Sequence, residues 1–168
     1  MTERVNRREI GFELNGERVE IECADSDLLI DVLRDGLGLT GVKRSCDMEI
    51  CGACTVLVEG QPISACSTLA YEAREKSVET IEGVAEGAQL HPLQRAFIEH
   101  GALQCGFCTP GMVLTAKALL ARVPTPTPEQ VIEELDGNLC RCTGYFKIVE
   151  AVMAAAQELK HREGNIHG

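Results

Sequence analysis

Cys46-Asp-Met-Glu-Ile-Cys51-Gly-Ala-Cys54 is the most informative stretch of the chain, and Cys66 follows it after eleven further residues. The first three cysteines have the C-x4-C-x2-C spacing of plant-type [2Fe-2S] loops, which take a fourth thiolate from a more distant position. Residues 55–64 have the pattern of strand, tight turn and returning strand. Such a hairpin would bring the last cysteine back to the loop, so we expect one cluster to be held by Cys46, Cys51, Cys54 and Cys66.

The residues before this loop predict a strand pair and a helix. Apolar residues alternate on both sides of the Asn-Gly pair at 15–16, which is typical of a hairpin closed by a type I′ turn. Asp25 or Ser26 is placed to cap a following helix, which would end at Gly36 in the left-handed conformation. With a further strand at 78–81, this order predicts a β-grasp.

The rest of the chain is predicted to be helical, after a linker at 83–87. Each periodic segment beyond it has helical spacing, and three of them open with Pro at the first helical position, where the missing N–H loses no hydrogen bond. Thr127 and Gln130 have capping-box spacing. We therefore divide the chain into domains 1–83 and 84–168, with helices expected at 92–100, 110–122, 128–136 and 145–160.

A second set of four cysteines lies in this helical part. Cys105-Gly-Phe-Cys108 and Cys140-Arg-Cys142 each lie before a helix start or between two helices, so their four thiolates can converge. Helix N-termini directed at an anionic cluster would stabilise it and lower the thiol pKa values. A structural zinc site with four cysteine ligands is the alternative for either set. The x4-x2 loop and the C-x-C pair together favour iron and sulfide.

The composition argues against several classes of function. The 168 residues include nine Cys but only four Phe, two Tyr and no Trp, so we expect metal centres to supplement a small core. The net charge of -10, with no basic cluster, argues against nucleic-acid binding. No apolar signal segment opens the chain, and no apolar run reaches membrane-spanning length. We therefore predict a cytoplasmic protein without a membrane span.

Longer motifs stand in order along residues 8–155: Cys51-Gly-Ala-Cys-Thr-Val56, His91-Pro-Leu-Gln94, Gln104-Cys-Gly-Phe-Cys-Thr-Pro-Gly-Met112 and Gly137-Asn-Leu-Cys-Arg-Cys-Thr-Gly144. In these motifs the sequence resembles the iron-sulfur subunit of the xanthine oxidase family of molybdenum hydroxylases. The resemblance implies an α+β fold. A β-grasp plant-type ferredoxin domain would be followed by a four-helix [2Fe-2S]-binding domain, and the second cluster would be held by Cys105, Cys108, Cys140 and Cys142.

The resemblance also implies partners. In the family, the C-terminal cluster faces molybdopterin in a large subunit and the N-terminal cluster faces FAD in a medium subunit. Gln104 and Cys142 match positions that touch the pterin. The implied protein is an electron-transfer subunit of an oxidoreductase, within a heterotrimer able to dimerise. It would relay electrons from molybdenum through two clusters to FAD while a small substrate is hydroxylated with oxygen from water. The chain alone would turn over no substrate and contributes no catalytic residue.

Two positions depart from the family pattern, because Ser45 and Glu49 stand where the family usually has Gly. Charged groups of both signs near this loop leave the direction of any change in reduction potential open. The ninth cysteine, Cys23, lies outside both sets and is expected to be structural. Two other functions stay open at this point: a free-standing ferredoxin-like electron carrier, and a zinc-stabilised interaction module. The substrate stays open as well, among carbon monoxide, aldehydes, purines and other N-heterocycles.

Overall fold

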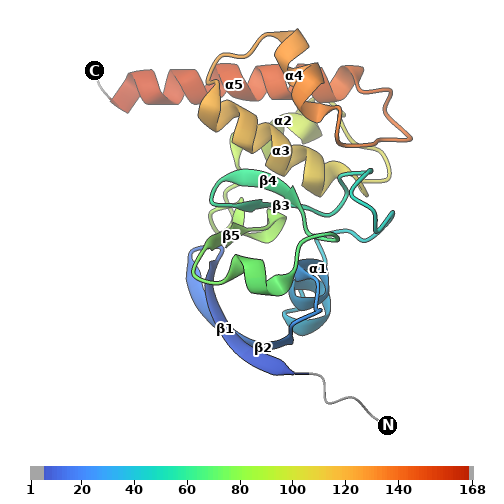
Figure 1. Ribbon diagram of the computed structural model, residues 1–168. Coiled ribbons are helices and arrows are strands. Elements are labelled where there is room, and N and C mark those ends of the chain that lie inside the picture. Colours follow the sequence, from blue (N-terminus) through green and yellow to red (C-terminus); the bar gives the residue numbers. More distant parts are fainter. Residues whose placement is uncertain (1–5, 167–168) are drawn as a thin grey trace.

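The computed structural model describes residues 6–166 and places a mixed five-stranded sheet beside a group of four helices (Figure 1). The sheet has the order β2-β1-β5-β3-β4, in which β1 and β5 are parallel and all other neighbours are antiparallel. This α+β arrangement confirms the predicted β-grasp followed by a helical part. The strands are β1 (Arg7–Leu14), β2 (Glu17–Ala24), β3 (Thr55–Val58), β4 (Gln61–Ser64) and β5 (Ser77–Glu79).

Both predicted hairpins are present, and their turns use the left-handed conformation. Asn15 and Gly16 have φ of 52° and 85°, as a type I′ turn requires, and join β1 to β2. Glu59 and Gly60 have φ of 51° and 73° between β3 and β4. The second hairpin sets the return path to Cys66.

The first helix differs from the prediction at its start. Helix α1 (Leu29–Asp31) has no side-chain cap, so the expected capping by Asp25 or Ser26 is wrong. The carboxylate of Asp27 instead accepts a hydrogen bond of 2.8 Å from the N–H of Ala24. This acidic segment therefore closes the end of β2, and the four residues 25–28 separate that strand from the helix.

The end of this helix also differs from the prediction. Gly36 is not in the left-handed conformation, which Gly38 adopts with φ of 72°. The reason is that α1 continues into a wider π-helical turn over Val32–Gly36, and this turn moves the chain reversal two residues along. Leu29 and Leu33, which face the sheet from this segment, are fully buried.

The four helices of the C-terminal part lie close to their predicted positions. The capping box of Thr127 and Gln130 is present, with hydrogen bonds of 2.8 and 3.3 Å. Pro110 is the second residue of its helix, not the first, because Thr109 already has helical hydrogen bonding. Tyr145, with φ of 68°, cannot join the last helix, which runs on past residue 160. The helices are α2 (Pro92–Glu99), α3 (Thr109–Arg122), α4 (Pro128–Leu135) and α5 (Phe146–Ile166).

Two apolar cores lie on either side of the junction between sheet and helices. One core packs the sheet against α1 around Phe12 and Val56, and the other fills the space between α2, α3, α4 and α5 around Met112. Val84 is buried in the helical core, so the segment predicted as a linker is anchored there. Among the described residues, no helix is long and apolar enough to cross a bilayer.

Candidate iron-sulfur sites

The N-terminal cysteine loop directs backbone N–H groups at a sulfur. Three loop residues, Asp47, Glu49 and Gly52, have φ between 52° and 64°, and left-handed residues in a tight loop turn successive N–H groups inward. Hydrogen bonds from the backbone of Met48, then from two further loop residues, lower the pKa of the Cys46 thiol to about 6. This side of the loop therefore favours a thiolate, the form that binds iron.

The other two cysteines of this set are brought together by the β3–β4 hairpin. The N–H of Ala65 donates to the carbonyl of Cys54 at 3.3 Å, which confirms that the hairpin returns the chain to the loop. Cys54 and Cys66 are both buried. Burial, followed by the neighbouring Cys66 thiol, raises the pKa of Cys54 to about 12. Metal binding at this pair would have to displace the protons.

The second set of cysteines gathers between the N-terminus of α3 and the loop joining α4 to α5. The sulfurs of Cys105 and Cys142 lie 3.6 Å apart. Burial raises the pKa of Cys108 to about 12, so the expected lowering by a helix N-terminus is wrong for this thiol. Burial also acts to raise the pKa of Cys140, but hydrogen bonds from the side chain and N–H of Thr143 outweigh it and leave this pKa lowered.

In each set the thiols approach one another as two pairs. The pairs are Cys46 with Cys51 and Cys54 with Cys66 in one set, and Cys105 with Cys142 and Cys108 with Cys140 in the other. Among the side chains that the structure describes, no three from His, Cys, Asp or Glu meet closely enough to share a single metal ion. Two thiolate pairs per site match the donor set of a two-iron cluster, in which each iron takes two cysteines and two sulfides.

A cavity of about 460 Å³ connects the two sets. Ser45 and Cys51 line it from the N-terminal loop, and the four cysteines of the helical set line it from the other side. Figure 1 shows the loop between α1 and β3 on the same side of the molecule as the loop between α4 and α5. The N–H of Leu139 donates to the carbonyl of Cys51 at 2.9 Å, so the two cysteine loops are in direct contact.

Gln104 and Cys142, the two positions matched to pterin contacts, lie together at the surface. The side-chain amide of Gln104 donates to the carbonyl of Cys142 at 3.1 Å, and both residues are exposed. Tyr145 was not predicted from the sequence as a site residue, yet its hydroxyl accepts from the N–H of Cys140 at 2.8 Å and donates to the carbonyl of Asn138 at 3.3 Å. A Tyr so close to a C-x-C pair is the signal that could have suggested this role.

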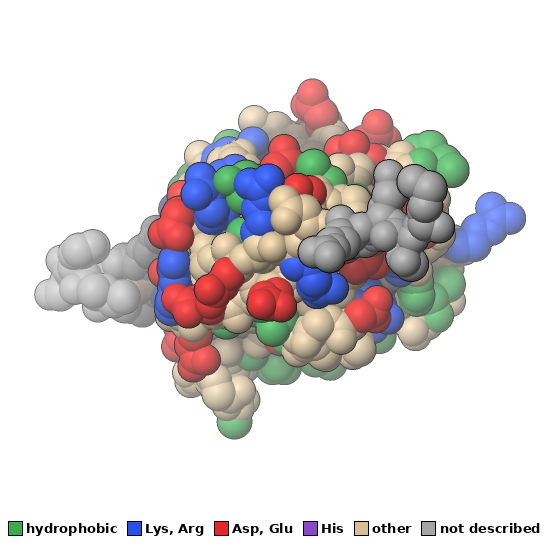
Figure 2. All heavy atoms as spheres, turned by 60° about the horizontal axis from the view of Figure 1, so that its bottom comes forward, with side chains coloured by type: hydrophobic (Ala, Val, Ile, Leu, Met, Phe, Trp, Pro, Cys, Tyr) green, Lys and Arg blue, Asp and Glu red, His purple; other side chains and the backbone are tan. Residues whose placement is uncertain are grey.

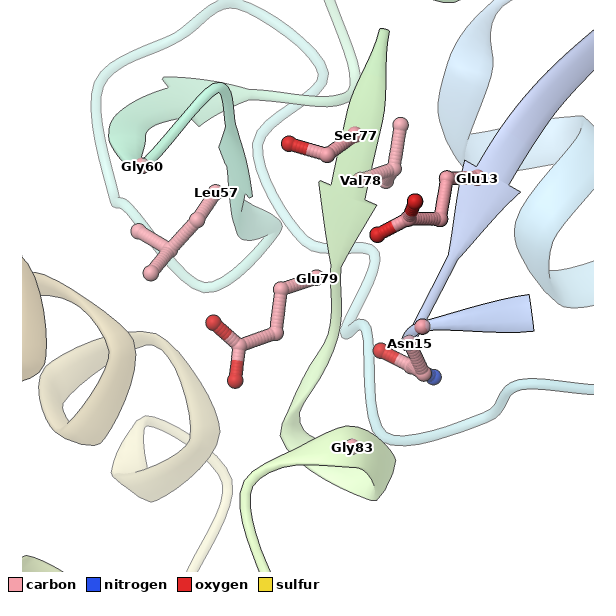
Figure 3. Close-up of a pocket in the computed structure, with 9 residues that line it drawn as sticks. Glu13, Asn15, Leu57, Gly60, Ser77, Val78, Glu79 and Gly83 are labelled. Carbon is pink, nitrogen blue, oxygen red and sulfur yellow. The ribbon is translucent and has the colours of Figure 1, made fainter. Parts of the chain in front are cut away.

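Another hollow, of about 210 Å³, lies in the sheet half (Figure 3). Two of its polar side chains already have partners, because Asn15 bonds to Thr80 and Glu79 forms an ion pair with Lys117 of α3. The hollow therefore belongs to the contact between the sheet and helix α3. Figure 2 shows acidic and basic side chains interspersed over one face of the molecule, as on an ordinary solvated surface.

Two family models match the chain in succession. A 2Fe-2S iron-sulfur cluster binding domain matches residues 12–84, and a [2Fe-2S] binding domain matches residues 80–153. The chain is 49% identical over 153 residues to the nicotinate dehydrogenase small FeS subunit of Eubacterium barkeri, covering 91% of this chain and 98% of that protein. It is 47% identical over 159 residues to the nicotine 6-hydroxylase small subunit of Paenarthrobacter nicotinovorans, covering 95% and 96%.

Solved structures agree with these matches. The crystal structure of quinoline 2-oxidoreductase from Pseudomonas putida 86 aligns with a TM-score of 0.89 and 43% identity, over 92% of this chain and 97% of that one. The aldehyde oxidoreductase from Desulfovibrio desulfuricans ATCC 27774 aligns with a TM-score of 0.89 and 44% identity, over 92% of this chain but 17% of that one. In that relative the same fold is one part of a much longer polypeptide.

Fold, thiol pairs and family models together define a two-cluster [2Fe-2S] electron-transfer protein. More specifically, the chain belongs to the iron-sulfur subunits of the xanthine oxidase family of molybdenum hydroxylases. It is therefore an oxidoreductase subunit with two [2Fe-2S] clusters as cofactors. The matched relatives are named as parts of dehydrogenase and oxidoreductase complexes, which disfavours both the free-standing carrier and the zinc-stabilised module.

Proposed function

We propose that this chain relays electrons from molybdopterin in a large partner subunit to FAD in a medium subunit, within a heterotrimer. The observation that carries this proposal is the arrangement of the two thiol sets. Cys51 of the N-terminal set and all four cysteines of the helical set line one cavity. The helical set reaches the surface at Cys105 and Cys142, whereas the N-terminal set is held by the Cys46–Cys54 loop and the end of the β3–β4 hairpin. Each set can therefore exchange electrons with a different partner while remaining in contact with the other set.

We assign all eight paired thiols as ligands. The deeper thiols hold each cluster against the apolar core, and the shallower thiols face the loops. Bound clusters would supply one-electron chemistry, and the chain's own residues would supply position and exclusion of water. The N-terminal cluster is assigned to Cys46, Cys51, Cys54 and Cys66, and the C-terminal cluster to Cys105, Cys108, Cys140 and Cys142.

The surface beside the C-terminal set is suited to docking a large subunit. An apolar groove of about 600 Å³ runs between α4 and the start of α5. Ile132 and Phe146 line this groove and are 58% and 69% exposed. Such a patch on a protein of this size marks an interaction surface. Because Gln104 and Cys142 lie at the same end of the helical part, we assign the molybdopterin subunit to this side.

The N-terminal loop presents its own apolar side chains. Met48 and Ile50 are 63% and 60% exposed on the loop that carries Cys46 and Cys51. We assign this surface to the flavin subunit, because the resemblance orders this cluster last before FAD. Both surfaces would then be covered in the complex, and water would be excluded from both clusters.

Two further assignments complete the proposal. We divide the chain into domains 1–83 and 84–168, supported by the two apolar cores, which separate at nearly this position apart from Leu57 and Ile81, both of which pack in the helical core. We also assign the complex to the cytoplasm, whose reducing conditions keep thiols free to bind iron.

Purification of the native complex tests the proposal. We expect this chain to co-purify with a molybdopterin subunit and a flavin subunit, and to contribute about four iron and four acid-labile sulfides from its two clusters. Stoichiometric zinc without cluster absorption would exclude the electron relay. A redox-active monomer with no partner would instead support a free-standing carrier.

The substrate is chosen by the large subunit, so this chain cannot select it. Relatives are named for nicotinate, nicotine, quinoline and aldehyde, and these compounds form a suitable panel. We expect one class of them to bleach the clusters and flavin of the purified complex. If none of these compounds bleached the clusters and flavin, their classes would be removed from the proposal, and carbon monoxide and purines would be tested next.

A further inference from the structure

Asn138 is a buried polar residue between the two cysteine sets. Its side chain is 4% exposed, and its amide donates to the carbonyl of Gly52 at 3.0 Å and to the hydroxyl of Thr55 at 3.4 Å. The Thr55 hydroxyl in turn donates to the same Gly52 carbonyl at 2.7 Å. A buried amide that loses such partners costs about 1–3 kcal/mol, so this small network holds the helical part against the N-terminal loop.

The residues on either side of this contact belong to the two cysteine sets. Gly52 follows Cys51, and Leu139 lies between Asn138 and Cys140. The hydrogen bond from the N–H of Leu139 to the carbonyl of Cys51 therefore links two proposed ligands. Cys51 accepts it directly, and Leu139 is the residue before Cys140. From the sulfur of Cys140 to the sulfur of Cys51, the route consists of covalent bonds and this one hydrogen bond.

Glycines allow the backbones to approach this closely. Gly52 has φ of 64°, and a Cβ there would lie 2.4 Å from the carbonyl oxygen of Gly137. A Cβ on Gly111 of α3 would lie 2.3 Å from the carbonyl oxygen of Gly52. Both distances are far inside van der Waals contact with backbone atoms. A side chain at Gly52 would push the two cysteine loops apart, and one at Gly111 would push the N-terminal loop away from α3.

We propose that Asn138 is a positioning residue for electron transfer between the two clusters, because it holds the Cys51 carbonyl against the Leu139 amide. This inference rests on the proposed function. One electron passes from the C-terminal to the N-terminal cluster, oxidising the first and reducing the second, with no bond formed or broken. Electron tunnelling decays faster through empty space than along bonded atoms, so loss of this contact would slow the step although both clusters remain bound.

The test compares three variants of the native complex. Asn138→Ala removes the amide, and Asn138→Ser is the second variant if the alanine form does not assemble. Val131→Ala is the matched control, because Val131 is fully buried in the helical core but is not part of the hydrogen-bond network around Asn138. Four quantities are measured for each variant. They are the iron content, the EPR signals of the dithionite-reduced clusters, the amide hydrogen exchange at residues 137–141, and the rate of cluster reduction by the complex's substrate, followed by freeze-quench.

We expect the Asn138 variants to retain both cluster signals. Their low-temperature magnetic splitting, which depends on the distance between the clusters, should decrease, the Leu139 amide should exchange faster, and reduction of the N-terminal cluster should be several-fold slower. Val131→Ala should change none of these despite its lower stability. Unchanged splitting and transfer rate in an Asn138 variant with full iron content would overturn this inference alone. Absence of two cluster signals in the unmodified complex would instead overturn the proposed function.

Discussion

Glu49 occupies a backbone conformation that suits glycine better than any L side chain. Its φ is 59°, and a left-handed residue with a Cβ carries a penalty of about 1–2 kcal/mol. The family resemblance places Gly at this position, so the departure found in the sequence carries a conformational penalty. Glu49 also adds a negative charge to a loop whose N–H groups point at a thiolate sulfur. Conformation and charge can be separated by substitution.

Replacement of Glu49 by Gly and by Gln should raise the reduction potential of the N-terminal cluster to a similar extent, because both remove a nearby negative charge that disfavours the reduced state. Only Glu49→Gly should also stabilise the fold, by about 1 kcal/mol, because it removes the left-handed penalty. EPR-monitored redox titration and thermal unfolding check the two effects. Glu17→Gln, on the distant strand β2, is the charge control. An unchanged potential in both Glu49 variants would remove this residue from the tuning of the cluster.

At the scale of elements, helix α2 begins with an uncommon cap. The ring nitrogen Nδ1 of His91 accepts from the N–H of Leu93 at 3.2 Å, and the side chain of Gln94 accepts from the N–H of His91 at 3.0 Å. Burial lowers the pKa of His91, followed by the positive charge of Lys117, against the opposing effect of Glu79. Arg162 and Arg95 lower it further. A protonated ring could not accept the capping hydrogen bond, so the cap depends on the neutral form.

The stability of the helical part should therefore fall in mild acid. Because the folded pKa of His91 lies below its unfolded value of about 6.5, the stabilisation is complete above that value and is lost as pH falls through it towards the folded pKa. His91→Asn keeps a capping oxygen that does not titrate, so it should lose less stability between about pH 7 and pH 5. Thermal unfolding by circular dichroism at several pH values measures the difference. His161→Asn, on the exposed end of α5, is the control, and equal acid sensitivity of the two variants would contradict the assignment.

At the scale of the whole molecule, the sheet and helical parts meet through polar and ionic contacts as well as apolar packing. Lys117 of α3 pairs with Glu79 of β5, and Leu57 of β3 enters the helical core. These contacts hold the two cysteine sets at fixed positions relative to each other. Several of the large apolar side chains that remain exposed lie around those sets. They are Met48, Ile50, Phe107, Leu139 and Phe146. The molecule is therefore organised around surfaces that partners would cover.

Phe146→Glu should weaken assembly with the large subunit while leaving both clusters bound. A charge in a buried apolar contact is costly, and loss of a central aromatic anchor typically costs about 2 kcal/mol or more, which is roughly 30-fold in Kd. Co-purification and light scattering of the complex measure the change. Ile98→Glu is the control, since Ile98 is 59% exposed on α2 outside the groove. Normal assembly of the Phe146 variant would place the docking surface elsewhere.

The order of the relay predicts different phenotypes for the two cysteine sets. Cys54→Ala should abolish the N-terminal cluster, yet substrate should still reduce molybdenum and the C-terminal cluster, so electrons would stop before the flavin. Gln104→Ala should keep both clusters and slow the first reduction, because Gln104 is a proposed pterin contact. EPR after substrate addition and stopped-flow bleaching of the flavin distinguish these outcomes. Flavin reduction at the unmodified rate in the Cys54 variant would contradict the proposed order.

Much of this architecture follows from local sequence patterns. The Asn-Gly turn at 15–16, the capping box at Thr127 and the spacing of Cys46, Cys51 and Cys54 each depend on neighbours within a few residues. The structure confirms the turn and the capping box. The predictions of a helix cap at Asp25 or Ser26 and of a left-handed Gly36 were wrong for a related reason. Several polar residues and glycines in that segment could serve, and packing of α1 against the sheet selected among them.

The sequence by itself determined the fold class, the two sets of cysteines and the family, because these depend on residue types at short spacings. Only the tertiary structure decided how the thiols pair, that burial opposes the helix N-terminus at Cys108, and that Asn138 contacts Gly52 across 86 positions. Such contacts depend on where two separately formed parts of the chain meet. No local pattern encodes that meeting, because the buried hydrogen bonds and glycine contacts that specify it exist only once both parts have folded.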